Sequence, residues 1–436
     1  MSQQSEPYEP LDLPEVETYT HRAHRFPGKF HPPLIAKVLR DHPEHDVVAD
    51  PMAGSGTLAV EAITSGRDTI CNDIDPLSSL ITRGKTHPTD PDRLRSLASD
   101  IREATDFPER GDYTEEEAKT RVEENLEGTE FVVPTNLLHW FEPFVAVGYS
   151  RLLITARDHV PEEDDQMWDA IRTALAAMVR QISRADPEPV SGLEVTKVRR
   201  EQLEEGVDFD VEQSFKNVSN RLAKGYEDLR TVDDLGNADV FRGDSKNFAG
   251  MCRDSGYNPT MVVTSPPYCN AIEYSRRHRL EYEWLGLFNN SPDKNAREER
   301  LDESRDFFGS VKPKQDTLRS LDPVPLTEVS EVTAEIEAEG HERKANLLRK
   351  YFLDAFDWIE QIHKVLPQGG VFCLIIGPST SYGRVINTPE YLKEIAERQG
   401  FVTESERSYK LVNNKMQYPT NGATTDTETL YTFRVE

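Results

Sequence analysis

Residues 47–57, with the sequence VVADPMAGSGT, decide the fold that we expect for this chain. The apolar run at 47–49 predicts a buried strand, and the glycine-rich turn after it leads into an apolar segment, 58–65, with helical character. Residues 69–73, TICND, predict a second strand. A strand, a helix and a strand in this order indicate a parallel sheet with right-handed crossover connections.

The rest of the chain extends this α/β pattern. Residues 88–235 predict long acidic amphipathic helices, notably at 136–160 and 165–183. Further strands are predicted at 238–241, 261–264, 370–377, 401–411 and 427–435. We therefore expect a Rossmann-like, doubly wound α/β sheet built from residues 1–87 and 236–436, with a mainly helical insertion at 88–235 and a polar insert at about 289–347.

Composition limits the classes of protein that remain. The 436 residues carry a net charge of −27, and arginine outnumbers lysine two to one. Such an acidic surface indicates adaptation to molar salt, a halophilic protein, although an ordinary acidic protein is the alternative. The polar N-terminus and the lack of a long apolar run predict a cytoplasmic protein with no membrane contact. Four scattered cysteines predict neither a metal site nor disulfides.

The turn at residues 50–57 is the first candidate binding site. Its glycines, Gly54 and Gly56, allow the backbone to approach a ligand at a helix N-terminus. Asp73 at the end of the next strand stands where a carboxylate accepts both ribose hydroxyls of a nucleoside cofactor. This spacing does not distinguish among NAD, FAD and S-adenosylmethionine as the cofactor. A Walker phosphate loop is excluded, because no Gly-Lys-Ser/Thr sequence follows the turn.

A second candidate site is the segment TSPPY at 264–268, directly after an apolar strand. Two consecutive prolines enforce extended backbone and remove two N–H donors, so carbonyl groups remain free to accept hydrogen bonds. In an open α/β sheet, ligands bind at the carboxyl ends of the strands. Acceptors beside the aromatic Tyr268 suit a flat ring that carries an amino group.

Together these motifs resemble those of the amino-group DNA methyltransferases that use S-adenosylmethionine, the N-4/N-6 DNA methylases. FPGKF at 26–30, DPMAGSGT at 50–57, NDIDP at 72–76 and SPPY at 265–268 carry the resemblance. It implies a methyltransferase sheet and catalytic roles for Ser265, Pro266, Pro267 and Tyr268. It implies contacts to S-adenosylmethionine from Phe26, Lys29, Phe30, Asp50, Pro51, Gly54, Ser55, Gly56, Thr57, Asp73 and Asp244.

The resemblance also implies a substrate. Ser265 in the first motif position is typical of enzymes that methylate N4 of cytosine, whereas Asp or Asn is usual for adenine N6, which is the alternative. Either base must flip out of double-stranded DNA, and Tyr268 is expected to stack on it. Methylation at cytosine C5 would need a Pro-Cys pair, and the chain has none. An RNA amino-group methyltransferase and a non-catalytic nucleotide-binding protein are further alternatives.

The resemblance leaves open whether the enzyme works alone or with a cognate restriction endonuclease. Residues 88–235 lie between the two motif groups, where related enzymes carry target recognition. The polar stretch at 289–347 is a second candidate for this role, and either region also suits a solvated helical cover. The charge of −27 counts against DNA binding unless basic residues gather locally. There are three candidate basic clusters, although each could instead pair with neighbouring acids: Lys197, Arg199 and Arg200; residues 276–279; and, in or beside the polar insert, Lys312, Lys314, Arg343, Lys344, Arg349 and Lys350.

Overall fold

The computed structural model describes residues 18–187, 193–269, 274–288, 308–309, 313, 317–318, 321–381, 384–410 and 427–436. Parts of the regions expected from the sequence therefore lie outside the described residues. These parts are residues 1–17, 188–192, 270–273, most of 289–320 with Lys312 and Lys314, 382–383 and 411–426.

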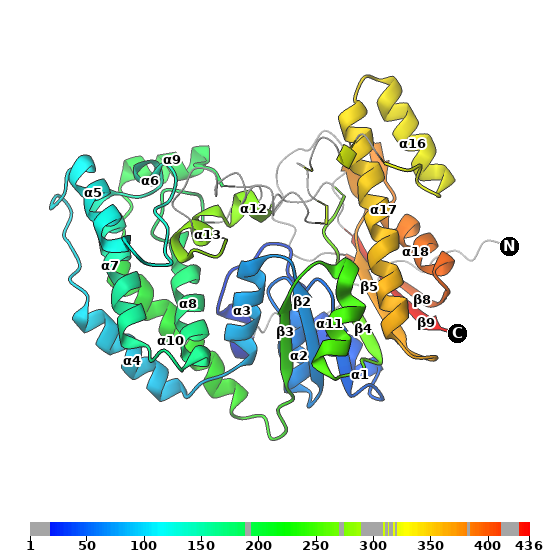
Figure 1. The fold of residues 1–436 in the computed structure, drawn as a ribbon, viewed down its shortest axis with the longest axis horizontal. Helices are drawn as coiled ribbons and strands as arrows, with labels where there is room; N and C mark the ends of the chain where they lie inside the picture. The colour runs from blue at the N-terminus through cyan, green and yellow to red at the C-terminus, as the bar shows by residue number, and fades with distance from the viewer. Residues whose placement is uncertain are drawn as a thin grey trace.

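A seven-stranded sheet lies at the centre of the molecule, in the order β3-β2-β1-β4-β5-β9-β8 (Figure 1). The pairs from β3 to β5 are parallel, whereas β9 runs antiparallel to both β5 and β8. This topology confirms the expected α/β sheet. The strands are β1 (Val47–Asp50), β2 (Asp68–Asp73), β3 (Ala238–Arg242), β4 (Met261–Thr264), β5 (Val371–Ile376), β8 (Phe401–Lys410) and β9 (Thr427–Val435).

Helices cover both faces of the sheet. Since successive residues of a strand point to opposite faces, each set of helices packs on a different set of strand residues. Val48 and Val263 pack under one set of helices, while Ala49 and Val262 pack under the other. The first set is α1 (Pro32–Asp41) and α2 (Thr57–Thr64), and the second is α11 (Phe248–Ser255), α17 (Glu342–Val365) and α18 (Thr388–Arg398).

The segment between β2 and β3 forms a separate helical layer beside the sheet, at the left of Figure 1. After α3 (Pro76–Thr86), its helices are α4 (Pro91–Ala104), α5 (Glu115–Leu126), α6 (Leu137–Trp140), α7 (Pro143–His159), α8 (Asp165–Val179), α9 (Lys197–Glu205) and α10 (Val211–Leu229). The helix predicted at 136–160 is divided into α6 and α7. Pro143 causes the break, since proline suits the first turn of a helix and disfavours helical backbone in the residue before it.

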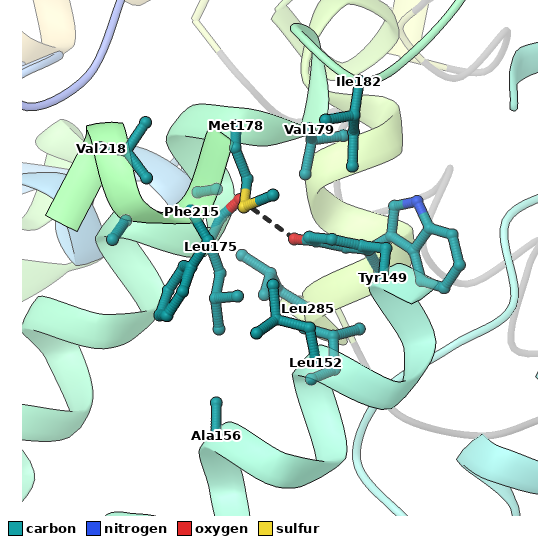
Figure 2. Packing of buried hydrophobic residues seen from close by; sticks show 14 of the residues in the cluster. Tyr149, Leu152, Ala156, Leu175, Met178, Val179, Ile182, Phe215, Val218 and Leu285 are labelled. Atoms are coloured by element: carbon teal, nitrogen blue, oxygen red, sulfur yellow. Dashed lines mark hydrogen bonds between the residues drawn. The ribbon is translucent and has the colours of Figure 1, made fainter. Parts of the chain in front are cut away.

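The helical layer has its own apolar core (Figure 2). Tyr149 of α7 is fully buried among Leu152, Leu175 and Phe215, and its hydroxyl donates to the Leu175 carbonyl oxygen at 3.0 Å. Trp284 packs edge-on against the Tyr149 ring, with centroids 5.0 Å apart. Trp284 belongs to α13 (Arg279–Leu285), which follows the SPPY segment and the short α12 (Tyr274–Arg277). The layer is thereby attached to the C-terminal half of the sheet domain.

The polar insert merges into the main domain through a continuous helix. Helix α16 (Thr327–Ala338) packs on α17, and both stand at the upper right of Figure 1. Residue 347 lies inside α17, whose later part buries Phe352 and Trp358 against the sheet. A small hairpin, β6 (Ser379–Ser381) and β7 (Arg384–Ile386), follows β5.

Candidate active site

A cavity lies at the carboxyl edge of the sheet, where the strand order reverses between β1 and β4. Such switch points are where open α/β sheets bind ligands. Residues from both sequence motifs share this cavity. Its walls include Phe26, Lys29, Phe30, Pro51, Gly54, Ser55, Thr57, Asp73, Asp244, Ser265 and Pro267.

Four of the residues singled out from the sequence are not among the described walls: Asp50, Gly56, Pro266 and Tyr268. Asp50 is fully buried beneath the turn, where its Oδ1 accepts from Thr264 Oγ1 at 2.7 Å and from the Met52 amide at 3.0 Å. Burial raises the pKa of Asp50 to about 7. Asp50 therefore joins β1 to β4 in this structure.

Gly56 directly precedes α2 and sets the backbone conformation of the glycine-rich turn. Its φ of +70° is in the left-handed region, and a Cβ there would lie 2.8 Å from the Thr82 side chain. Both conditions require glycine. Gly54, with φ +52°, faces the cavity instead.

Asp73 holds the glycine-rich turn from the neighbouring strand. Its Oδ2 accepts from the Gly54 amide at 2.7 Å, and its Oδ1 accepts from the Asp75 amide at 2.9 Å. Burial, followed by the charge of Asp75, raises the pKa of Asp73 to about 8. The carboxyl group lines the cavity at the end of β2, as a ribose acceptor requires.

Two buried polar residues that were not expected at the site support the same loops. Asn72 Nδ2 donates to the Pro51 carbonyl at 3.0 Å and to the Gly243 carbonyl at 2.9 Å, which joins the glycine-rich turn to the loop that carries Asp244. Lys85 of α3 is fully buried, and its Nζ donates to the Ser55 carbonyl at 2.5 Å. The sequence signal for Lys85 was its place four residues after Ile81 on an apolar helix face.

Three buried hydroxyl groups line the cavity without a hydrogen-bond partner in the described part of the chain. They are Ser55 Oγ, Thr57 Oγ1 and Ser78 Oγ. Buried hydroxyls are nearly always paired, so these three suit a polar ligand. The cavity thus offers a carboxyl group, hydroxyls and the aromatic Phe26, which fits a nucleoside cofactor with charged and ring portions. Ser78 was not among the residues expected at the site from the motifs.

The SPPY segment meets the cavity through Ser265 and Pro267. Tyr351 of α17 donates from its hydroxyl to the Pro267 carbonyl at 2.8 Å. Phe308 lines the cavity and stacks on Tyr351, with ring centroids 4.6 Å apart. The position of the segment therefore depends on α17, far along the chain, and no local sequence pattern indicates this contact.

Tyr268 is bound to the last strand of the sheet. Its hydroxyl donates to Glu428 Oε1 at 2.6 Å, while the Tyr409 hydroxyl donates to Glu428 Oε2 at 2.6 Å. Burial, and then the Glu428 carboxylate, raise the pKa of Tyr268, so its hydroxyl stays protonated. A Cβ on Gly377 would lie 3.2 Å from the Tyr268 ring. The ring thus lies against Gly377, which directly follows β5, and its hydroxyl is held by Glu428 of β9.

Asp75 connects the cofactor half of the domain to the helices after the SPPY segment. Its Oδ1 accepts from the Leu77 amide at the start of α3, and its Oδ2 accepts from the Tyr282 hydroxyl at 2.7 Å. His278 Nδ1 lies 3.1 Å from the same oxygen. The His278 ring also contacts Phe26, with centroids 4.8 Å apart.

Each of the basic clusters at 197–200 and 276–279 has both buried and exposed members. Arg199 is buried and donates to the Ser183 carbonyl, while Lys197 is exposed and pairs with Glu201. Arg276 pairs with Glu194 at 3.6 Å, and Arg277 is buried at the base of a second cavity.

In the part of the chain that the structure describes, no helix has the length and apolarity to cross a bilayer. One described group has the spacing of metal ligands: His42, Glu44 and His45, whose ligand atoms lie within 4.8 Å of one another. It precedes β1, at the sheet edge opposite the cavity.

Two known proteins are similar in sequence to this chain, and no protein-family model matches it. The type II methyltransferase M.MvaI of Kocuria varians is 24% identical over 283 residues, which cover 62% of this chain and 58% of that protein. The type II methyltransferase M.MjaII of Methanocaldococcus jannaschii is 33% identical over 92 residues, 21% of this chain and 17% of that protein. The chain is thus distantly homologous to type II methyltransferases, and its sheet is consistent with a Rossmann-like methyltransferase fold.

Proposed function

We propose that this protein is a site-specific DNA methyltransferase that transfers the methyl group of S-adenosylmethionine to the N4 amino group of a flipped-out cytosine. The observation that carries this proposal is the shared cavity. Asp73 and the glycine-rich turn line the same space as Ser265 and Pro267, although the whole helical layer, β3 and β4 lie between them in the sequence. The distant homology to two type II methyltransferases supports it.

The residues that would hold the cofactor follow from the chemistry of the cavity walls. Asp73 would accept the ribose hydroxyls, Phe26 would pack on an apolar part, and Ser55, Thr57 and Ser78 would bind polar groups. Asp244 would accept from the adenine amino group. When bound, the cofactor supplies an electrophilic methyl group on a sulfonium. Asp50 and Gly56 would act indirectly, by shaping the turn.

The SPPY segment would supply the acceptors for the target base. An exocyclic amino nitrogen is a weak nucleophile because its lone pair is delocalised into the ring. Hydrogen bonds from its protons to Ser265 Oγ and the Pro266 carbonyl favour the tetrahedral nitrogen that attacks. These acceptors are already oriented, because Tyr351 holds the adjoining Pro267 carbonyl, so they stabilise the transition state by preorganisation.

Tyr268 would present its ring to the flipped base while Glu428 holds its hydroxyl. Ser265 favours cytosine N4, and adenine N6 is the second candidate on the same geometry. The helical layer would read the DNA sequence. We further propose that the protein acts inside the cell, in a restriction-modification system with a cognate endonuclease or as a solitary enzyme.

Methyl transfer to DNA tests the proposal. Full-length protein is incubated with plasmid DNA and S-adenosylmethionine tritiated in its methyl group, and label in precipitated DNA is counted. Ser265→Ala should reduce transfer by about 10²-fold to 10³-fold, with cofactor affinity nearly unchanged. The control Ser96→Ala changes an exposed serine of α4 and should retain wild-type transfer. Unlabelled DNA with bound cofactor would overturn the proposal.

A further inference from the structure

Three side chains with the chemistry of metal ligands lie in the turn between α1 and β1. His42, Glu44 and His45 each offer one ligand atom, and these atoms all lie within 4.8 Å of one another. Glu44 Oε1 lies 3.4 Å from His45 Nε2 and 4.0 Å from His42 Nδ1. None of the three lines the cofactor cavity, and the turn precedes β1, at the opposite edge of the sheet. The cluster is therefore separate from the proposed site of methyl transfer.

The His45 ring brings a buried nitrogen without a partner to this cluster. His45 is 5% exposed, and its Nε2 makes no hydrogen bond in the described part of the chain. The nearby Glu44 carboxylate does not satisfy it, because the 3.4 Å contact lacks the geometry of a hydrogen bond. Buried polar atoms without partners are uncommon in folded proteins. A cation held between Nε2 and the Glu44 carboxylate would satisfy both groups.

The other ring nitrogen of His45 is held as a metal ligand requires. Its Nδ1 lies 2.9 Å from the hydroxyl of Thr260, the residue directly before β4. With the proton on Nδ1, the ring donates to Thr260 and presents the lone pair of Nε2 to the cluster. Histidine ligands usually make such a second hydrogen bond, which fixes the tautomer and the orientation of the ring. Thr260 thus positions His45 for an ion.

Arg67 fixes the backbone of the turn that carries the two histidines. This arginine is buried, and its guanidinium donates to the His45 carbonyl at 2.8 Å and to the His42 carbonyl at 3.3 Å. It also donates to the carbonyl of Leu39, within α1, at 2.8 Å. The backbone of both histidines is therefore ordered before an ion binds, which reduces the entropy cost of binding.

The Glu44 carboxylate is not neutralised by an arginine or a lysine. Among the described residues its ion-pair partners are the two histidines, which carry a charge only when protonated. Two arginines lie close enough for their charges to act on His45. One of them, Arg67, donates to backbone carbonyls, and the other, Arg434, pairs with Glu404. The carboxylate is thus available as the anionic ligand of a cation.

The donor atoms indicate the class of ion. Two imidazole nitrogens and one carboxylate oxygen suit a divalent transition-metal ion, whereas Mg²⁺ and Ca²⁺ prefer oxygen ligands. Zinc accepts such a set at bond lengths of about 2.0–2.2 Å and takes water in its fourth position. Ligand atoms in a tetrahedral site are about 3.3 Å apart, so these three must approach one another by up to about 1.5 Å. The Glu44 side chain, which is 57% exposed, can make this movement.

We propose that His42, Glu44 and His45 bind one divalent transition-metal ion, with Zn²⁺ as the ion that this set fits. The ion strengthens the connection between the turn before β1 and Thr260 before β4, so its role is structural. The site contains no cysteine, and the cysteine spacing of the chain therefore did not indicate it. The inference does not depend on the proposed function, since these residues lie outside the cofactor cavity.

Zinc binding to full-length protein without a polyhistidine tag tests the proposal. The protein is treated with EDTA, exchanged into chelator-free buffer and titrated with ZnCl₂ in a calorimeter. Excess MgCl₂ is present, because it occupies carboxylates that bind cations loosely on a surface of this acidity. The wild type should bind one equivalent of Zn²⁺. Zinc-edge X-ray absorption should then report two imidazole nitrogens and oxygen ligands at about 2.0–2.2 Å.

The main variant is Glu44→Gln, because Glu44 is exposed and the change keeps its size. This variant and His42→Gln should each bind Zn²⁺ at least about tenfold more weakly. Thr260→Val removes only the positioning hydroxyl and should weaken binding by about 10-fold to 100-fold. The matched control, Glu162→Gln/His139→Gln, changes an exposed glutamate that also follows a proline and an exposed histidine, and it should bind as the wild type does.

Thermal unfolding provides a second measurement and checks the fold of the variants. Without zinc, Glu44→Gln should melt at the wild-type temperature, since Glu44 makes no buried contact that folding requires. Zinc at about a hundredfold excess over its dissociation constant should raise the melting temperature of the wild type by about 2–5 °C, and that of Glu44→Gln by less.

Two results would overturn the proposal. The first is the absence of zinc binding by the wild type. The second is binding of equal affinity in the wild type, Glu44→Gln and His42→Gln, which would assign the zinc to adventitious groups on the acidic surface. Methyl transfer to DNA is not a readout in these experiments, so their outcome leaves the proposed function untouched.

Discussion

Thr264 donates from Oγ1 to Asp50 Oδ1 at 2.7 Å, and this bond joins the last residues of β4 and β1 across the switch point of the sheet. One strand leads into the glycine-rich turn and the other into the SPPY segment. The bond therefore fixes the two halves of the proposed site relative to each other. Asp50 was expected to contact the cofactor, and its buried position instead gives it this connecting role.

Loss of the Thr264 hydroxyl should therefore weaken both stability and cofactor binding. We expect Thr264→Val to lower the free energy of unfolding by about 1–3 kcal/mol, because the buried Asp50 carboxyl group loses one of its two donors and keeps only the Met52 amide. Thr264→Ser keeps the hydroxyl and is the control. Denaturant unfolding and cofactor titration measure the two effects, and equal stability of Thr264→Val and wild type would contradict the role.

The buried Asn72 should contribute more to the free energy of unfolding than an exposed asparagine does. Its amide bonds join two loops of the cofactor cavity, so Asn72→Ala leaves two buried carbonyls without this donor. We expect a loss of about 2–4 kcal/mol in unfolding free energy and a weaker complex with S-adenosylmethionine. The control Asn237→Ala removes an exposed asparagine bonded to Asp68 and should cost less than about 0.5 kcal/mol. Similar losses in both variants would refute the assignment.

Cofactor affinity should depend on pH through Asp73. The pKa of this carboxyl group in the free protein is raised to about 8, so it is mainly protonated at neutral pH. Ribose hydroxyls donate best to the ionised form, hence affinity for S-adenosylmethionine should increase as the pH rises from 6.5 toward 9, by up to about tenfold per unit below the pKa. Asp73→Asn should bind weakly with a flat profile. A profile in the wild type that matches the variant would contradict this account.

Tyr268 should separate catalysis from cofactor binding. Tyr268→Ala removes the ring proposed to stack on the base, so methyl transfer should fall strongly while the dissociation constant of S-adenosylmethionine changes little. Tyr268→Phe retains the ring but loses the bond to Glu428, and we expect an intermediate rate. Tritium transfer and calorimetric cofactor binding measure the two quantities. Equal loss of both in Tyr268→Ala would mean that Tyr268 supports the fold and does not act on the base.

Salt should stabilise the protein if its acidity is an adaptation. Screening of the repulsion within a chain of charge −27 should raise the melting temperature between about 0.2 and 2 M KCl. Thermal unfolding followed by circular dichroism measures this. A melting temperature that stays constant or falls as KCl increases would contradict salt adaptation and indicate an ordinary acidic protein.

Much of this structure was predictable from local patterns. The strands around residues 47–73 and 261–264 follow from short apolar runs bounded by turns, and their carboxyl ends meet because the sheet is parallel. The shared cavity then brings most of the residues selected from the motifs together. Pro143 explains why one predicted helix is two, and that signal was present in the sequence.

Contacts between distant segments were not predictable. Tyr351 reaches the Pro267 carbonyl from α17, and Glu428 binds the Tyr268 hydroxyl from the last strand. Neither pair has a periodicity or spacing that links its members in the sequence. The second cavity, which Arg277 lines, likewise gathers arginines from four separate segments, whereas the sequence showed only the cluster that contains Arg277.

The reaction proposed for this protein is the transfer of a methyl group to an amino group of DNA. Nucleoside mass spectrometry of plasmid DNA, after incubation with full-length protein and S-adenosylmethionine in low salt and in molar KCl, tests it most directly. We expect N4-methylcytosine with the wild type, and about 10²-fold to 10³-fold slower formation of it with Ser265→Ala. N6-methyladenine would keep the enzyme class and refute Ser265 as the residue that selects cytosine. DNA without any methylated base in either salt, from protein that binds the cofactor, would contradict the claim.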